Sequence, residues 1–190
     1  MQMFEYIIVL ISIVIGLALT HLMQGIARLI QHPGRARIWW VHLVWVAYMF
    51  LSTIFWWWFE FRLQRIETWT FSLYAFVVFY AFYIYLICAL LFPRDLDGYE
   101  GYQDYFLSRR KWFFGLLIGM FPIDLIDAAI KNTADVDYFA TLGAEYLISW
   151  GIQTLGALGG LLTRRAAIHA AIAVTYLVYL LVLRMFSTVS

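Results

Sequence analysis

Three acidic residues lie within long apolar stretches of the chain, where carboxylates are rare. Asp124 and Asp127 are three residues apart, and Glu145 follows in the next apolar stretch. Residues at i and i+3 share one face of a helix. A carboxylate in apolar surroundings pairs with a cation or holds a proton. These residues therefore predict a shared site for protons or small cations, and a purely structural pairing of the acids is the alternative.

Histidine and glutamine side chains extend this candidate site. His21 and Gln24 belong to a polar stripe along the first apolar stretch, and His42 lies near the start of the second. The other members of the stripe are Glu5, Ser12, Gly16, Thr20 and Arg28. Imidazole exchanges protons near neutral pH. We therefore expect a polar pathway from the three acids toward His21, Gln24 and His42, although a lone histidine near a helix end is also typical of packing.

A redox site is a second interpretation of the same histidines. His42 and His169 both lie a few residues from a helix end that we place on the cytoplasmic side, so they are candidate ligands for a haem. The third apolar stretch carries rings at helical spacing that could hold a quinone, or simply face lipid: Phe76, Phe79, Tyr80 and Tyr83. The leading interpretation requires no cofactor, and the sequence identifies none.

The composition shows what kind of protein positions these residues. The chain has 190 residues, of which 64% are hydrophobic and 13% charged, and its mean hydropathy is +0.79. Soluble domains have roughly 45–50% apolar and about 25% charged residues. The net charge of +1 gives no basic field for nucleic acid. Cys88 is the single cysteine, so no intrachain disulfide can form. We expect one membrane domain spanning residues 1–190, without a cleavable signal peptide.

Six apolar stretches are long enough to cross a bilayer, which takes about 20 residues of helix. They cover residues 4–30, 38–61, 69–92, 112–130, 138–162 and 166–187. Their length and their lack of period-2 alternation argue against strands. The sequence therefore predicts an all-α integral membrane protein with six transmembrane helices.

Basic residues predict the orientation, because Lys and Arg are enriched in cytoplasmic connections. Nine of the 13 flank the odd-numbered connections: Arg28, Arg35, Arg37, Arg94, Arg109, Arg110, Lys111, Arg164 and Arg165. Four lie on the opposite side: Arg62, Arg65, Lys131 and Arg184. We therefore expect the inner membrane of a cell, a cytoplasmic loop over residues 93–111, and both termini outside the cytoplasm.

Residues 53–61, TIFWWWFEF, contain three consecutive tryptophans. Consecutive residues on a helix point about 100° apart, so the three rings cannot line one pocket. Tryptophans are enriched where a helix meets the headgroups. We interpret this segment as membrane anchorage, and a ligand-stacking site is the alternative.

An internal similarity raises the possibility of a repeat. Residues 15–28, IGLALTHLMQGIAR, align with residues 118–131, IGMFPIDLIDAAIK, at a constant offset. The alignment sets His21 and Gln24 opposite Asp124 and Asp127. Half-repeats over residues 1–92 and 107–190 would make a three-plus-three inverted repeat, an arrangement typical of transporters. Chance similarity between apolar helices is the alternative.

No phosphate-binding loop, zinc-binding HExxH motif or nucleophile elbow is present, so the sequence gives no argument for an enzyme. The leading functional hypothesis is a transporter or channel for protons or small cations, with the lipid bilayer as its other partner. The haem or quinone protein is the second, and a membrane assembly subunit without chemistry of its own is the third. Two GxxxG motifs, Gly115–Gly119 and Gly156–Gly160, fit close helix packing or a homo-oligomer.

Overall fold

The structure is a computed structural model that describes residues 3–34, 36–134 and 138–184; the side chains of residues 133–145 and 183–184 lie outside this description. The described residues form helices and no strands, which confirms the all-α prediction. The helices are α1 (Met3–Gln31), α2 (Trp40–Phe59), α3 (Phe71–Ala89), α4 (Tyr102–Ala134), α5 (Tyr138–Leu162) and α6 (Ala166–Tyr179). A 3₁₀ helix η1 (Glu60–Arg65) extends α2, and a π-helical turn η2 (Leu180–Arg184) extends α6.

Four of the described helical segments are long and apolar enough to cross a membrane: Met3–Gln31, Trp40–Arg65, Phe71–Ala89 and Tyr102–Asn132. The described parts of the last two helices form shorter apolar segments, Tyr146–Leu162 and Ala166–Val182. Apolar residues predominate in these segments. Such composition is typical of membrane spans or of helices buried in a large core.

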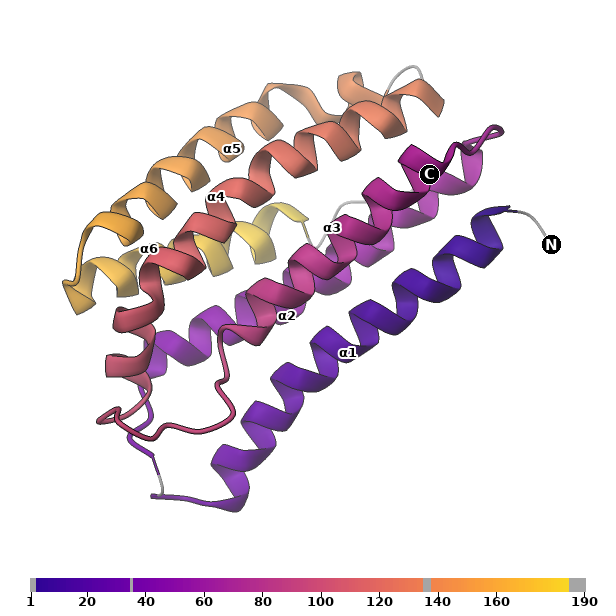
Figure 1. Cartoon of the computed structure of the whole chain (residues 1–190). Helices are drawn as coiled ribbons and strands as arrows, with labels where there is room; N and C mark the ends of the chain where they lie inside the picture. The colour runs from indigo at the N-terminus through magenta and orange to yellow at the C-terminus, as the bar shows by residue number, and fades with distance from the viewer. Residues whose placement is uncertain (1–2, 35, 135–137, 185–190) are drawn as a thin grey trace.

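The helices run as an up-and-down bundle (Figure 1). The ends of α1, α3 and α5 meet the starts of α2, α4 and α6 at one end of the bundle. The start of α1 lies at the other end with η1, where the rings of Phe4 and Phe61 are in edge-to-face contact. Tyr179 at the end of α6 lines the same cavity as Phe59 and Lys131, so it also lies at this second end.

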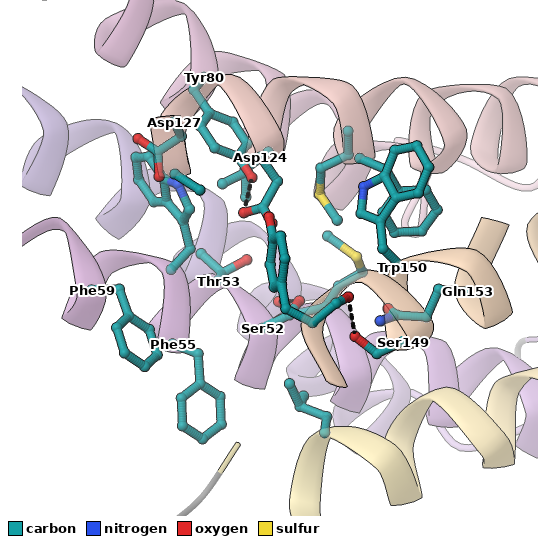
Figure 2. Close-up of a pocket in the computed structure, with 18 of the residues that line it drawn as sticks. Ser52, Thr53, Phe55, Phe59, Tyr80, Asp124, Asp127, Ser149, Trp150 and Gln153 are labelled. Atoms are coloured by element: carbon teal, nitrogen blue, oxygen red, sulfur yellow. Dashed lines mark hydrogen bonds between the residues drawn. The ribbon is translucent and has the colours of Figure 1, made fainter. Parts of the chain in front are cut away.

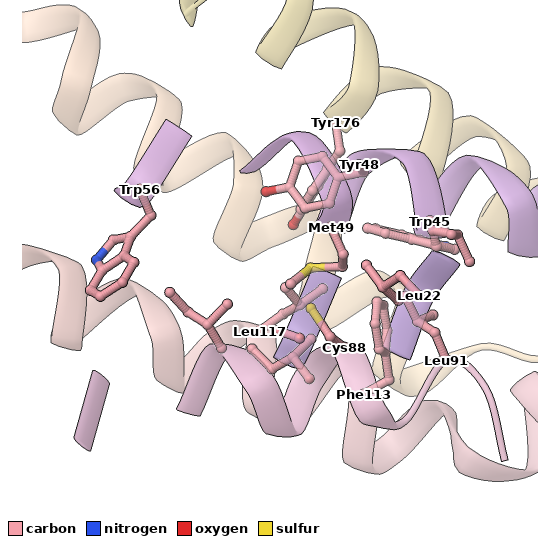
Figure 3. Close-up of a cluster of buried hydrophobic side chains, with 14 of the residues drawn as sticks. Leu22, Trp45, Tyr48, Met49, Trp56, Cys88, Leu91, Phe113, Leu117 and Tyr176 are labelled. Carbon is pink, nitrogen blue, oxygen red and sulfur yellow. The ribbon is translucent and has the colours of Figure 1, made fainter. Parts of the chain in front are cut away.

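α2 occupies the centre of the bundle and contacts α1, α3, α4 and α6. Its buried rings form much of the core (Figure 3), where Trp45 and Tyr48 both make edge-to-face contacts with Tyr176 of α6. Of the three consecutive tryptophans, Trp56 is buried, whereas Trp57 and Trp58 are exposed. The rings therefore point in different directions, as the 100° spacing predicts.

The predicted loop over residues 93–111 is too long, because α4 begins at Tyr102. Tyr102, Tyr105 and Phe106 are buried in the helical core, and their packing extends α4 by about three turns beyond the predicted start. The helix also continues through Pro122. The connection between α3 and α4 is therefore confined to residues 90–101.

Helix packing gives the predicted inverted repeat no support. In a three-plus-three repeat α1 would be equivalent to α4, and α3 to α6. The most extensive contacts of α1 are with α3, whereas α4 packs mainly on α5 and α6 on α2. The equivalent helices therefore have different neighbours.

Candidate functional site

The candidate site is built on one face of α4. Asp124, Asp127 and Lys131 fall within an arc of about 60° at 3.6 residues per turn, so their side chains project from the same side of the helix. All three line one cavity, and Figure 2 shows the positions of Asp124 and Asp127 in it. The spacing that predicted a shared position for the two aspartates also brings a lysine to this face.

Lys131 forms a buried ion-pair cluster with two carboxylates. Its Nζ donates to Glu60 Oε1 at 2.6 Å and to Asp127 Oδ2 one helical turn back. The exposed fractions are 2% for Lys131, 0% for Glu60 and 3% for Asp127. Ions removed from water this completely are costly unless they are paired and hydrogen-bonded. Each charge in the cluster therefore compensates the desolvation of its neighbours.

Glu60 lies where α2 ends, as the first residue of the 3₁₀ helix η1. η1 packs against α4, and Leu63 in the same turn is fully buried. Arg62 is also nearly buried and has interactions of its own. Glu60 reaches Lys131 from this turn, so its carboxylate faces α4 instead of the headgroup level expected for the end of an anchoring segment.

Asp124 lies beside the cluster and is held by two tyrosines. Tyr80 of α3 donates its hydroxyl to Oδ1 at 3.1 Å, and Tyr146 of α5 donates to Oδ2 at 2.6 Å. Figure 2 shows the first of these bonds. Each oxygen of Asp124 therefore has a hydroxyl donor. Hydrogen bonds to a charged group are shorter and stronger than neutral ones.

Two carboxylate oxygens in the cluster lack a hydrogen-bond donor. Among the described residues, no partner contacts Glu60 Oε2 or Asp127 Oδ1, although both atoms are fully buried. A buried acceptor without a donor costs about 1–3 kcal/mol. These two oxygens can therefore accept a further proton, a hydrogen bond from water, or a cation.

The cavity has a volume of about 130 Å³ and lies between α2, α3, α4 and α5, with the end of α6 at its margin. Besides the charged residues it is lined by short polar side chains, which include Ser52, Thr53, Ser149 and Gln153. A space of about 10–15 Å³ of this kind accepts one water, whereas sites for drug-sized ligands take about 300–1,000 Å³. This cavity suits a few waters or a small ion.

His21 and His42 do not reach the cavity and instead bind the end of α3. His42 Nε2 is 2.6 Å from the carbonyl oxygen of Leu91, and His21 Nε2 is 3.1 Å from that of Phe92. Tyr105 donates to the preceding carbonyl, that of residue 90. Along α2, His42 is about 27 Å from Glu60 at 1.5 Å per residue. Both histidines therefore satisfy backbone carbonyls at the opposite end of the bundle.

Gln24 and Glu145 complete the predicted set. Gln24 is exposed on the outer face of α1. Glu145 lies in α5, but its side chain falls outside the described residues. The structure therefore brings together Asp124 and Asp127, and places His21, Gln24 and His42 elsewhere.

The two histidines proposed for haem are engaged in packing. His42 stacks on Tyr102 at a ring distance of 4.6 Å, and His169 lies beside Phe114 at 5.4 Å. His169 Nε2 is 3.1 Å from the carbonyl oxygen of Thr163. Within the part of the chain that the structure describes, no group of three or more His, Cys, Asp or Glu is placed to hold a metal ion. These contacts give the haem alternative no support.

Sequence reasoning missed Glu60 and Lys131 as site residues. It counted Lys131 as a flanking charge on the outer side, although the side chain is buried. One signal was available, because an acid and a base four residues apart on a helix form an ion pair. No pattern pairs Glu60 with Lys131, since their contact joins residues 71 positions apart.

A scan against protein-family models and searches of curated proteins and solved structures found no match to this chain.

Proposed function

We propose that the protein is a membrane transporter or channel for protons or small cations, with Glu60, Asp124, Asp127 and Lys131 as its site. The observation that carries the proposal is that carboxylates outnumber ammonium groups in a buried cluster beside the cavity. Three carboxylates face a single ammonium group, and two carboxylate oxygens have no hydrogen-bond donor among the described residues. A further proton or a cation would balance this excess.

Burial of these charges costs free energy, so the cluster is a poor way to stabilise the fold. Replacing a buried ion pair by apolar residues of similar volume is often neutral or stabilising, so stability alone gives little reason to keep one. Ionisable residues inside membrane spans commonly mark ion pathways or proton relays. The cavity beside Asp124 supplies space for a few waters or a small ion.

In this proposal all six helices cross the bilayer, with the odd-numbered connections in the cytoplasm and both termini outside. An even number of crossings agrees with the position of the start of α1 and the end of α6, which both lie at the end of the bundle that holds η1. The basic residues still favour this orientation after Lys131 is removed from the flanking charges. The inner membrane of a cell remains the predicted location.

Flux through pure protein in liposomes tests the proposal. A pH-sensitive dye trapped inside reports proton movement when a potential is imposed, and sodium or lithium uptake is measured in parallel. We expect flux in the parent protein and at least a tenfold loss in Asp124→Asn, which keeps the volume but removes the charge. Glu67→Gln is the matched control, because Glu67 is an exposed acid just beyond η1. Flux that survives in Asp124→Asn, Glu60→Gln and Asp127→Asn contradicts this site, and absence of any flux in the parent contradicts the function.

A second candidate function is an assembly subunit, which the outer face of α1 favours. Thr20 and Gln24 are exposed on this face, and a Cβ added at Gly16 would meet no atom within 4 Å. Polar side chains in hydrocarbon are better satisfied against another helix than against lipid. This candidate predicts that Gln24→Cys forms a disulfide-linked dimer in native membranes while the liposomes show no flux. Monomeric Gln24→Cys would contradict it.

A further inference from the structure

Lys131 occupies a place between two carboxylates that a free cation could occupy instead. Its ammonium lies between Glu60 and Asp127 and donates a hydrogen bond to one oxygen of each. We propose that the Glu60–Asp127 pair binds one small monovalent cation in exchange for one proton, and that the Lys131 ammonium fills the site when the cation is absent. This inference rests on the proposed transport function and assigns it a substrate class and an exchange mechanism.

The oxygen atoms of the site exceed what Lys131 uses. The pair presents four carboxylate oxygens, of which Glu60 Oε1 and Asp127 Oδ2 bind the ammonium. Glu60 Oε2 and Asp127 Oδ1 are buried, and no donor among the described residues reaches them. Hard cations prefer oxygen ligands and accept carboxylates through one or both oxygens. A cation between the two groups can therefore use the atoms that the ammonium leaves without a partner.

Access to the pair is from the cavity. Asp124, Asp127 and Lys131 line the cavity, and Glu60, which is completely buried, contacts Lys131. An entering cation meets Asp124, whose oxygens hold the hydroxyls of Tyr80 and Tyr146, and then the pair that Lys131 occupies. The ammonium must move aside before the cation can bind both carboxylates.

Charge balance determines what leaves. A monovalent cation adds one positive charge to a site that is removed from water, where an unbalanced charge is costly. The charge of the cluster stays constant if one N–H bond of the Lys131 ammonium breaks, the electron pair remains on Nζ, and the proton passes to water in the cavity. The neutral amine then stays beside the bound cation. Arg62 of η1, a second nearly buried base, has interactions of its own.

Liposomes with equal potassium and valinomycin on both sides hold the membrane potential at zero and isolate exchange from conduction. An inward sodium or lithium gradient should then drive protons out, one for each cation taken up, and a choline gradient should not. Calorimetry of sodium and lithium binding in two buffers of different ionisation enthalpy should count one proton released per cation bound.

Two substitutions of Lys131 separate its roles. Lys131→Arg keeps a positive charge between the acids, but a guanidinium does not give up its proton in proteins. We expect this variant to lose at least tenfold in gradient-driven exchange. Lys131→Gln leaves no ammonium to displace, so cation binding should persist in this variant. Lys111 is an exposed lysine of the same helix, about two and a half turns after its start, and Lys111→Arg and Lys111→Gln are the matched controls with unchanged exchange.

The possible results distinguish this inference from the proposed function. Proton flux that follows the membrane potential but ignores sodium and lithium overturns the exchange and leaves the proton-transport function standing. Unchanged exchange in Lys131→Arg, or a count of zero protons per cation in the parent, overturns the role of Lys131. The calorimetric count on the parent decides the matter even if a Lys131 variant fails to fold. Absence of any flux in the parent contradicts the proposed function itself.

Discussion

Among the described residues, Lys131 is the base that forms ion pairs with Glu60 and Asp127, and Lys131→Met removes it. The loss of folding stability in this variant can be worked out from the geometry of the two pairs. Methionine matches lysine in length and helix propensity, so packing and helix formation change little. Both acids are then left buried without their counter-ion. Removing one partner of a buried pair costs about 3–5 kcal/mol, and two hydrogen bonds to charged groups at about 1.5–3 kcal/mol each give a similar figure. Since domains are stable by about 5–15 kcal/mol, this loss is a large fraction of the whole.

Equilibrium unfolding in mixed micelles, followed by far-ultraviolet circular dichroism, measures the loss. Adding Glu60→Gln and Asp127→Asn to Lys131→Met removes the stranded charges, so the triple variant should regain most of the stability. A matched Lys111→Met variant should be close to the parent, because Lys111 is exposed. A loss below about 1 kcal/mol in Lys131→Met, or a triple variant less stable than the single one, would refute the argument that charge compensation dominates at this cluster.

Three further predictions concern the core. Gly25→Ala should lose about 1–3 kcal/mol of unfolding free energy, because the new Cβ would lie 2.1 Å from the ring of Phe92. Gly115→Ala is the control: its new Cβ would meet nothing within 4 Å, so this variant should be neutral or slightly stabilising in the same assay. Cys88 is fully buried and should react with a maleimide only after unfolding, so labelling of the folded protein within minutes would argue against this packing. His42→Phe should cost about 1–3 kcal/mol, since it leaves a carbonyl at the end of α3 without its imidazole partner, and an unchanged unfolding curve would show that this bond is dispensable.

The helices could be predicted from the sequence because their signal is local. A long apolar stretch has one stable backbone conformation in a bilayer, so the predicted boundaries at residues 138, 162 and 166 coincide with helix ends. The start of α4 could not be predicted in this way. Its first turns carry charged and polar residues, a composition that predicts a loop. These turns are helical because Tyr102 and Phe106 are buried against residues at the start of α2.

The candidate site was predictable only where its residues share a helix. Asp124 and Asp127 are one turn apart, and their common face follows from helical periodicity alone. Glu60 lies on another element, and a contact across 71 positions depends on how η1 meets α4. Conversely, His21 and His42 carried the right chemistry for a proton pathway, but the bundle places them against main-chain carbonyls at its other end.

The packing of α1 on α3 has a consequence for biogenesis. The buried face of α1, which includes Ile7, Ile11, Ala18 and Leu22, makes its main contacts with a helix that ends at Ala89. At about 5–20 residues per second, a ribosome needs roughly 3–12 s to add residues 32–89. During that interval the first hairpin cannot be a finished folding unit. Ribosome-bound chains that stop after α2 should therefore present the inner face of α1 to lipid, to the insertion machinery or to a membrane chaperone, and α1 acquires its native neighbour only when the third helix enters the bilayer.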